Sequence, residues 1–165
     1  IEKAIEVITD SFKNGNKTLF CGNCGTTADA QHIAAELSGR FYFDRPPLHA
    51  ETCNVNSSFL TAADNDYGYN QPFYRYIKAM GKEGDISIEL STSENSENII
   101  EAFKIAKELN MFCIDFTGVD REKLKELSNI LINIPSNNTP RIQEAHISIG
   151  HIICEMVEQS LFSHV

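Results

Sequence analysis

Two turns rich in glycine or hydroxyl side chains hold the first residues suited to binding a phosphate. Cys21 to Thr27 reads Cys-Gly-Asn-Cys-Gly-Thr-Thr and stands between an apolar run and a helical pattern. Ser91 to Ser96 has the same surroundings, with hydroxyl groups on four of its six residues. Glycines allow close approach of the backbone, and the start of a helix offers free N–H groups and a positive dipole. The sequence therefore predicts that both turns bind phosphate at strand ends.

Each turn also has a competing interpretation. The first lacks the Gly-Lys-Ser/Thr ending of a Walker loop and the G-x-G-x-x-G of a dinucleotide site, so bound ATP or NAD is poorly supported. The second could simply cap the helix that follows it. Cys21 and Cys24 form a C-x-x-C pair, but there is no second pair to build a zinc site, so packing is favoured over redox chemistry. Packing is also the interpretation for Cys53, Cys113 and Cys154.

A histidine and a glutamate follow the first turn at helical spacing. His32 and Glu36 are four residues apart, so both side chains project from one face of a helix. Such a pair is usually a surface contact, but beside a phosphate-binding turn it could bind a metal ion or move protons. Arg141 to His146, followed by His151, adds a second polar group near the end of the chain. His146 and His151, five residues apart, are not expected to share a helix face.

A predicted alternation of strands and helices positions these residues. Short apolar runs separated by segments of helical period are typical of βα units around a parallel sheet. The predicted strands are Thr18–Cys21, Leu48–Cys53, Ile86–Leu90, Phe112–Phe116 and Ile130–Ile134. The predicted helices are Ala28–Leu37, Pro72–Met80, Ile99–Leu109 and a long one from Thr139 to Leu161. The last helix carries more apolar surface than a monomer would leave exposed, which indicates burial against another subunit.

Length and charge narrow the class of protein further. With 165 residues, one compact domain is expected. The net charge of −9 argues against a general nucleic-acid or anionic-membrane surface, so any bound phosphate must be held by local geometry. No apolar stretch is long enough for a membrane span, and the start of the chain lacks the layout of a secretory signal. The protein is therefore interpreted as cytoplasmic.

Five blocks of the sequence between Lys17 and Phe162 share their order and spacing with a known family: Gly22-Asn23-x-Gly25-Thr26, Asp29-Ala30-Gln31-His32-x-Ala34-Ala35-Glu36-Leu37-x-Gly39-Arg40, Asn65-Asp66-Tyr67-Gly68-Tyr69, Ser91-Thr92-Ser93-x-Asn95-Ser96 and Arg141-Ile142-Gln143-Glu144-x-His146-x-x-x-Gly150-His151. With these blocks the sequence resembles the phosphoheptose isomerases, also called sedoheptulose 7-phosphate isomerases, of the sugar isomerase (SIS) family.

The resemblance implies a fold and an assembly. The expected fold is α/β, a three-layer α/β/α sandwich with a five-stranded parallel sheet of flavodoxin-like order, forming a single SIS domain over residues 1–165. The family's additional N-terminal helix would be represented by Ile1 to Lys13 alone. The expected assembly is a homotetramer with active sites at subunit interfaces, which agrees with the apolar last helix.

The resemblance also implies a reaction. Sedoheptulose 7-phosphate would be isomerised to D-glycero-D-manno-heptose 7-phosphate through an enediol, an early step towards activated heptose for lipopolysaccharide or capsule. Glu36 would be the catalytic base and His151 its acid/base partner. The implied zinc ligands are His32, Glu36, Gln143 and His151. The implied substrate-binding residues are Asn23, Gly25, Thr26, Glu36, Asp66, Ser91, Thr92, Ser93, Ser96 and Gln143.

One spacing bears on the zinc set. Gln143 and His151 are eight residues apart, a rise of about 12 Å along a straight helix. This is near the limit for two side chains that meet at one metal ion. Contributions from more than one subunit would relieve it.

Four residues depart from the family's pattern. Cys24 stands where glycine is usual, Thr26 where serine is usual, and Glu94 where glycine is usual. Glu89 is an unexpected acid inside an apolar run, and carboxylates near a phosphate would repel it. These departures leave open a different sugar phosphate, a different sugar end group or weakened activity.

Two functions without catalysis remain as alternatives. One is a non-catalytic SIS protein that binds a sugar phosphate or a protein partner, such as the bacterial relative that binds a replication initiator. That relative lacks the glutamate and histidine found here at Glu36 and His151. The other is a sugar-phosphate-sensing domain of a transcription regulator, but no DNA-binding segment accompanies this chain.

Overall fold

A single parallel sheet forms the centre of the molecule in the computed structural model, which describes residues 1–93, 96–119 and 122–163. Its strand order is β2-β1-β3-β4-β5, and every neighbouring pair is parallel. The strands are β1 (Thr18–Gly22), β2 (Ala50–Thr52), β3 (Ile86–Leu90), β4 (Phe112–Thr117) and β5 (Ile130–Asn133). The helices are α1 (Glu2–Lys13), α2 (Gly25–Ser38), α3 (Ser57–Tyr67), α4 (Pro72–Met80), α5 (Glu97–Glu108), α6 (Glu122–Lys125) and α7 (Thr139–Phe162).

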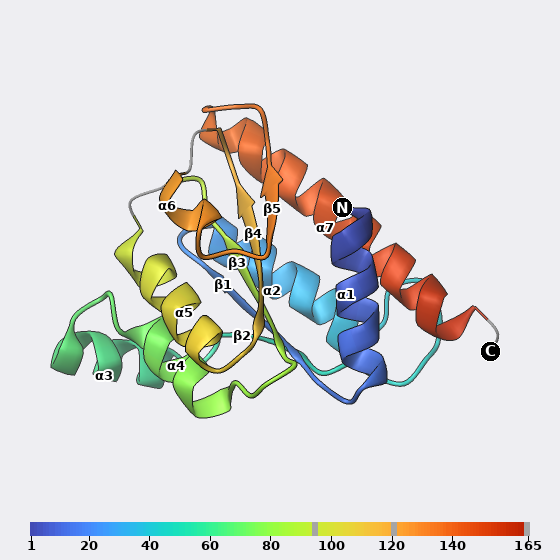
Figure 1. Ribbon diagram of the computed structural model, residues 1–165, viewed down its shortest axis with the longest axis horizontal. Helices are drawn as coiled ribbons and strands as arrows, with labels where there is room; N and C mark the ends of the chain where they lie inside the picture. The colour runs from blue at the N-terminus through green and yellow to red at the C-terminus, as the bar shows by residue number, and fades with distance from the viewer. Residues whose placement is uncertain (94–95, 120–121, 164–165) are drawn as a thin grey trace.

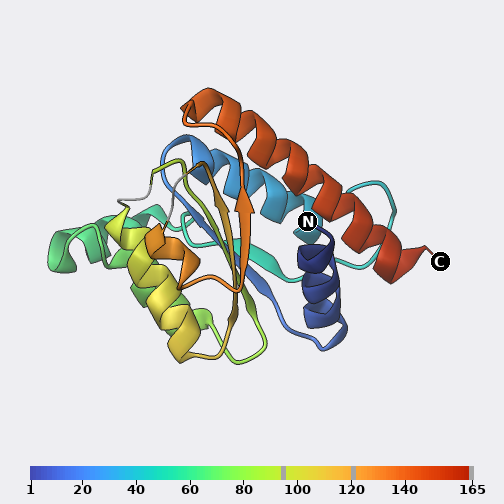
Figure 2. The same ribbon diagram turned by 45° about the horizontal axis from the view of Figure 1, so that its top comes forward.

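Helices cover both faces of the sheet, so the molecule has three layers. Figures 1 and 2 show α1, α2 and α7 on one side and α4, α5 and α6 on the other. Each side has its own buried cluster: Ile8, Ile33 and Ile153 belong to the first, and Phe73 and Phe103 to the second. The prediction of an α/β/α sandwich around a five-stranded parallel sheet is confirmed.

The apolar pattern of the sequence predicted the five buried strands but did not predict the exposed helix α3. All five predicted strands are present, although β2 is shorter than the predicted Leu48–Cys53 because the Leu48 N–H donates to the Leu37 carbonyl. No helix was predicted at α3. Ala63 is its only fully buried residue and Leu60 is partly buried against the second cluster, so its apolar stripe is short. Its start is fixed by the Asn56 side chain, which accepts from the Phe59 N–H.

The strand order creates a crevice where the predicted phosphate turns lie. β1 and β3 are neighbours in the sheet, and Gly22 pairs with Leu90 at their carboxyl ends. The connections from these two strands lead to opposite faces, since α2 packs in one layer and α4 and α5 in the other. Open α/β sheets bind ligands at such a switch point. The fold therefore brings Cys21–Thr27 and the start of Ser91–Ser96 to one edge of the sheet.

Four of the five cysteines are buried and all five are free thiols. The Cys21 and Cys53 sulfur atoms are 3.0 Å apart inside the second cluster, whereas Cys24 is exposed. Burial, followed by the neighbouring Cys53, raises the pKa of the Cys21 thiol. A buried thiol with a raised pKa is a poor nucleophile. The prediction that Cys21, Cys53, Cys113 and Cys154 pack in the interior is confirmed.

No helix within the described ranges is both long enough and apolar enough to cross a membrane.

The acid that the sequence places inside a strand is fully buried. One Glu89 carboxylate oxygen accepts from the Ser87 hydroxyl at 2.6 Å, and the other has no hydrogen-bond partner among the described residues. Glu89 pairs with Asp115 on β4. Burial raises the pKa of Glu89 well above its ordinary value of 4.5, and the negative charge of Asp115 raises it further. The Ser87 hydrogen bond acts in the opposite direction.

Glu89→Gln is expected to stabilise the protein at neutral and mildly alkaline pH. Glu89 keeps its proton in the folded protein at a pH where the unfolded chain has released it. The stability that Glu89 contributes is therefore fully present below pH 4.5 and is lost as the pH rises through the folded pKa. Each pKa unit of difference corresponds to about 1.4 kcal/mol. The free energy of unfolding, measured in urea, should fall less between pH 5 and pH 8 in the variant than in the wild type. Exposed Glu108→Gln is the control, and equal losses in all three proteins would contradict the prediction.

Candidate active site

His32, Glu36 and His151 form one cluster. Their ligand atoms all lie within 4.8 Å of one another. His32 Nε2 is 3.1 Å from Glu36 Oε1 and 3.1 Å from His151 Nε2. About half of the His32 side chain and a quarter of the Glu36 side chain are exposed, so solvent and a ligand can reach them. The structure therefore brings together three of the four predicted metal ligands, including both predicted catalytic residues.

Close packing of two helices produces this cluster. His32 and Glu36 share one face of α2, and α7 supplies His151. Gly150, just before His151, lies against Ile33, and a Cβ at position 150 would overlap the Ile33 side chain. A larger residue there would push α7 away from α2. The glycine thus permits the approach that places His151 beside His32.

The donor set fits a zinc ion. Zinc binds imidazole nitrogen and carboxylate oxygen at about 2.0–2.2 Å in tetrahedral geometry, which places two ligand atoms roughly 3.3 Å apart. The two 3.1 Å separations at His32 are close to that value before any ligand adjusts. Two imidazoles and one carboxylate leave a fourth position open, as in catalytic zinc sites.

Gln143 lies at another place on α7. Its side-chain amide packs against Gly25 at the start of α2, where a Cβ would overlap it. Gly25 precedes His32 by seven residues, about 10 Å along the helix. Within one chain, Gln143 is therefore placed beside the first turn rather than beside the three other predicted metal ligands. Gly25 has no side chain because this amide occupies the space.

Phe41 and a buried ion pair hold the loop that follows α2 against His151. The Phe41 ring is 5.7 Å from the His151 ring. The Glu158 carboxylate accepts from the N–H groups of Phe41, Tyr42 and Phe43 and from Arg45 Nε at 2.9 Å. Arg45 also donates to the Leu37 and Glu36 carbonyls at the end of α2. This loop clamp, Arg45 with Glu158, fixes one wall of the site.

The first predicted phosphate turn is stabilised by its own side chains. Thr26 is buried, and its hydroxyl accepts from the Asn23 N–H and donates to the Asn23 carbonyl. The Thr26 hydroxyl thus closes the turn, and sequence reasoning had assigned it to the substrate. Cys24 has φ of 51° and ψ of −119°, a conformation that favours glycine. This is a physical reason for the glycine that the family resemblance implies at position 24.

The second predicted phosphate turn follows β3. Ser91 is buried and donates to the Ser93 carbonyl at 2.7 Å, and Ser93 is exposed. Thr92 is half-buried. Ser96 occupies the N-cap position of α5 but makes no side-chain cap hydrogen bond, so capping alone does not account for it. Glu94 and Asn95 lie outside the described residues.

Asn23 and Ser96 line a common cavity of about 320 Å³, together with Tyr69, Asn70, Glu97 and Asn98. Tyr69 also lines an adjoining cavity of about 310 Å³ with Thr27 and Asp64. Asp66, the other residue predicted to contact the sugar, is exposed near the end of α3 and accepts from the Asn65 amide. The fold thus gathers Asn23 and Ser96 at the sheet edge, whereas Asp66 stands on the surface.

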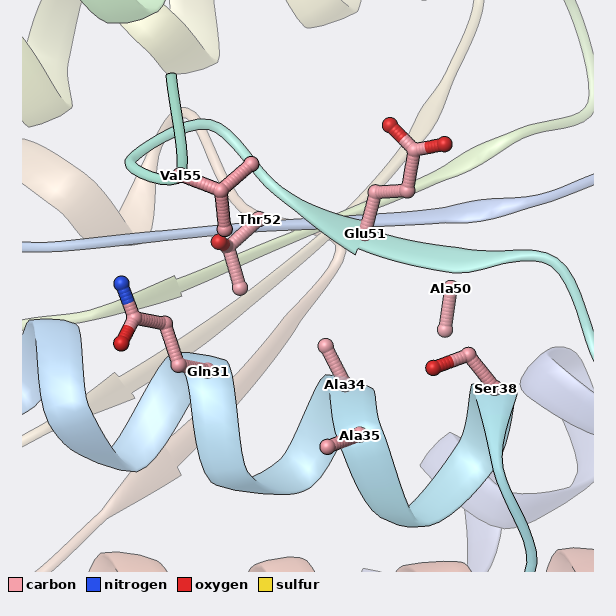
Figure 3. A pocket seen from close by; sticks show the side chains of 8 residues that line it. All are labelled: Gln31, Ala34, Ala35, Ser38, Ala50, Glu51, Thr52 and Val55. Carbon is pink, nitrogen blue, oxygen red and sulfur yellow. The ribbon is translucent and has the colours of Figure 1, made fainter. Parts of the chain in front are cut away.

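A further hollow, of about 220 Å³, lies between α2 and the edge strand β2 (Figure 3). Three alanines, Ala34, Ala35 and Ala50, form much of its wall. Figure 3 shows the Glu51 carboxylate on the side of the strand away from α2. None of the predicted site residues lines this hollow. Its small apolar wall is unsuited to a phosphorylated sugar.

Sequence reasoning missed three residues beside the site. Asp29 lies one turn before His32. Burial raises the pKa of its carboxyl group above the ordinary value, although the nearby His32 partly opposes this shift. Asn98 is buried and bonded to Asn23. Tyr69 donates to Asn23 as well. Asp29 and Tyr69 fall inside blocks shared with the family, which is the signal that could have identified them. His146, by contrast, is fully buried against Phe116 and belongs to the core.

Comparisons with known proteins agree with this geometry. The model of the SIS domain family matches residues 1–118. A phosphoheptose isomerase from Clostridium acetobutylicum is 49% identical over 162 residues, covering 98% of this chain and 83% of the relative. One from Aneurinibacillus thermoaerophilus is 51% identical over 160 residues, covering 97% and 79%. A phosphoheptose isomerase structure from Francisella tularensis superposes with a TM-score of 0.92 at 35% identity, covering 96% of this chain and 84% of the other.

Identity near one half over almost the whole chain exceeds what a shared fold alone requires. The match extends through both turns, α2 and α7, the elements that carry the cluster. The chain belongs to the phosphoheptose isomerase family of SIS domain proteins.

Proposed function

We propose that this protein isomerises sedoheptulose 7-phosphate to D-glycero-D-manno-heptose 7-phosphate. The observation that carries the proposal is the His32–Glu36–His151 cluster in a chain about half identical to phosphoheptose isomerases. A non-catalytic SIS protein would not need a carboxylate and an imidazole within reach of one ligand. The product would supply activated heptose for lipopolysaccharide or capsule.

The chemistry requires two proton movements. In the ketose, a base removes a proton from C1 while the C2 oxygen gains one, which gives an enediol. Return of a proton to C2, with loss of the proton on the C1 oxygen, gives the aldose. We assign the carbon proton to Glu36 and the oxygen proton to His151. Their ligand atoms lie within 4.8 Å of each other, so both can reach adjacent atoms of one substrate.

A zinc ion is proposed as the cofactor, with His32, Glu36 and His151 as ligands in this chain. When bound, zinc would polarise the sugar carbonyl and orient the hydroxyl beside it. His32 and Glu36 would hold the ion from their shared face on α2, and the Glu36 carboxylate would also serve as the base. Gln143 is proposed as a ligand from a second subunit, because its amide lies at the far end of α2 within one chain.

The assembly is proposed to be a homotetramer whose active sites lie at subunit interfaces. Thr26 and Glu36 are ten residues apart on α2, about 15 Å along the helix. A seven-carbon sugar phosphate extends roughly 9 Å from phosphorus to C2. One molecule could therefore contact the phosphate turns of one subunit and the cluster of another. Ile152 and Met156 on α7 are 46% and 41% exposed, which supports burial of this helix in an interface.

The phosphate group would be bound by the backbone at Gly25 and Thr26 and by four hydroxyl side chains, those of Ser91, Thr92, Ser93 and Ser96. The sugar would be bound by Asn23 and Asp66. We propose a cytoplasmic location, which agrees with five free thiols. The net charge of −9 supports a small-molecule substrate over a nucleic acid or a membrane surface.

Conversion of sedoheptulose 7-phosphate by the purified protein tests the proposal. We expect turnover with zinc, loss of turnover with a chelator, and the aldose as the product identified by NMR. Metal analysis should give one zinc per chain, and His32→Ala should reduce it, independently of activity. A folded, zinc-loaded protein that leaves the sugar unchanged would overturn the assignment.

A further inference from the structure

The side-chain amide of Asn23 is held by residues from two other parts of the chain. Asn23 Nδ2 donates to Asn98 Oδ1 at 3.0 Å, and Asn98 Nδ2 donates back to Asn23 Oδ1 at 2.9 Å. The Tyr69 hydroxyl donates to the same Asn23 oxygen at 3.0 Å. Asn23 follows β1, Tyr69 follows α3 and Asn98 lies in the first turn of α5. Only the tertiary structure brings these three side chains together.

A backbone group fixes the orientation of the whole network. The Ile99 N–H, which can only donate, is 3.0 Å from one terminal atom of Asn98 and also 3.0 Å from the Ser96 carbonyl. An NH₂ group so close to this N–H would be repelled, which favours the oxygen at that position. The other terminal atom of Asn98 is then the NH₂ group, and it must face the oxygen of Asn23. Burial, followed by the charges of Cys24 and Asp64, raises the pKa of Tyr69, which keeps its hydroxyl group a donor.

This network leaves Asn23 with one unused donor. Its oxygen accepts from Asn98 and Tyr69, and one of its two N–H bonds is directed to Asn98. The remaining N–H has no partner within the network. Both asparagines line the 320 Å³ cavity. Asn98 is only 4% exposed and both of its terminal atoms are bonded to Asn23, so its own amide is fixed by the protein.

We propose that Asn98 and Tyr69 are positioning residues, which hold Asn23 so that it presents a single N–H donor to an oxygen of the sugar phosphate. The inference rests on the proposed function and deepens it. Asn98 acts through Asn23 without touching the substrate. If the Asn23 amide turned over, it would present a carbonyl oxygen and repel the oxygens of the ligand.

Asn98→Asp is the direct test. Aspartate keeps the size of the side chain and can accept from the Ile99 N–H and from Asn23 Nδ2, but it has no proton to donate to Asn23 Oδ1. We expect KM for sedoheptulose 7-phosphate to rise about tenfold and kcat to change less than about threefold, because a contact remote from the reacting carbons contributes equally to substrate and transition state. Tyr69→Phe, which adds no charge, should raise KM about threefold.

Asn70→Asp is the matched control. Asn70 lines the same cavity, so the substitution adds the same charge there without changing the partners of Asn23. Its effect on KM measures charge repulsion alone. Equal increases in KM for the Asn98 and Asn70 variants, or an unchanged KM for Tyr69→Phe, would overturn the inference.

A spectroscopic measurement separates this inference from the proposed function. The side-chain NH₂ signals of Asn23 in ¹⁵N NMR, assigned by their loss in Asn23→Asp, should shift in Tyr69→Phe and Asn98→Asp but not in Asn70→Asp. If the wild type fails to convert the sugar, the proposed function is wrong, and titration with the unconverted sedoheptulose 7-phosphate then decides the donor role. A ligand-dependent shift of Asn23 that Asn98→Asp removes supports positioning, and the absence of such a shift overturns it.

Discussion

Glu36→Gln is expected to lower kcat for sedoheptulose 7-phosphate by at least about 10³-fold while leaving the fold intact. Positioned acid–base groups contribute about 10²–10⁴-fold to rate. Here the carboxylate is both the proposed base and a neighbour of His32 at 3.1 Å. Glutamine keeps the length of the side chain but cannot take a proton from carbon. Because Glu36 is largely outside the buried clusters, thermal unfolding should change little.

Two measurements on this variant, with one control variant, separate loss of the base from loss of zinc. Metal analysis should be compared between Glu36→Gln and wild type at saturating zinc, since glutamine is the weaker ligand. Exchange of the C1 proton with deuterated water should disappear with turnover. Glu108→Gln, at the exposed end of α5, is the control and should retain wild-type kcat. Full activity of a zinc-loaded Glu36→Gln protein would remove Glu36 from the mechanism.

Glu158→Ala is expected to cost about 3–5 kcal/mol of unfolding free energy, the range for removing one partner of a buried ion pair. The Arg45 and Glu158 side chains are each 1% exposed. Without Glu158, the Arg45 charge and the N–H groups of Phe41, Tyr42 and Phe43 lose their acceptor. The loop would also release Phe41 from His151, so activity should fall in the folded fraction.

This clamp also has a pH signature. Burial alone would raise the pKa of Glu158, but hydrogen bonds from three backbone N–H groups and from Arg45 outweigh it and lower the pKa below 4.5. The stability it contributes is present above pH 4.5 and is lost as the pH falls through the folded pKa. The free energy of unfolding, measured in urea, should therefore fall less between pH 7 and pH 3 in Glu158→Ala than in the wild type.

Glu155→Ala on the same helix is the matched control, because Glu155 is half-buried and its hydrogen bond to a described residue stays within α7, to Gln159. A loss below about 1 kcal/mol in Glu158→Ala, or one equal to that of Glu155→Ala, would contradict the role assigned to the clamp. A double replacement of Arg45 and Glu158 by apolar residues should recover part of the stability, since it leaves no buried charge unpaired.

The sequence determined features that depend on neighbours along the chain. Apolar runs and helical periods predicted all five strands, because a parallel strand buried on both faces is apolar throughout. The four-residue spacing of His32 and Glu36 predicted a shared helix face, which the structure confirms. The helix α3 was not predicted, because a helix with one fully buried residue shows no clear apolar stripe in its sequence.

Tertiary structure decided everything that joins distant segments. His151 and His32 are 119 residues apart in the sequence, and they come together because Gly150 leaves room for the Ile33 side chain. Glu158 accepts from the Phe41 N–H across 117 residues. The Thr26 hydroxyl group closes its own turn by donating to the Asn23 carbonyl, a contact that the sequence did not predict. The spacing of residues along one element specifies which side chains share a face, but packing between elements sets which faces meet, and packing depends on the shape of the whole core. Residue spacing therefore predicted the α2 half of the cluster, the family resemblance implied His151, and the approach of α7 brings the three side chains together.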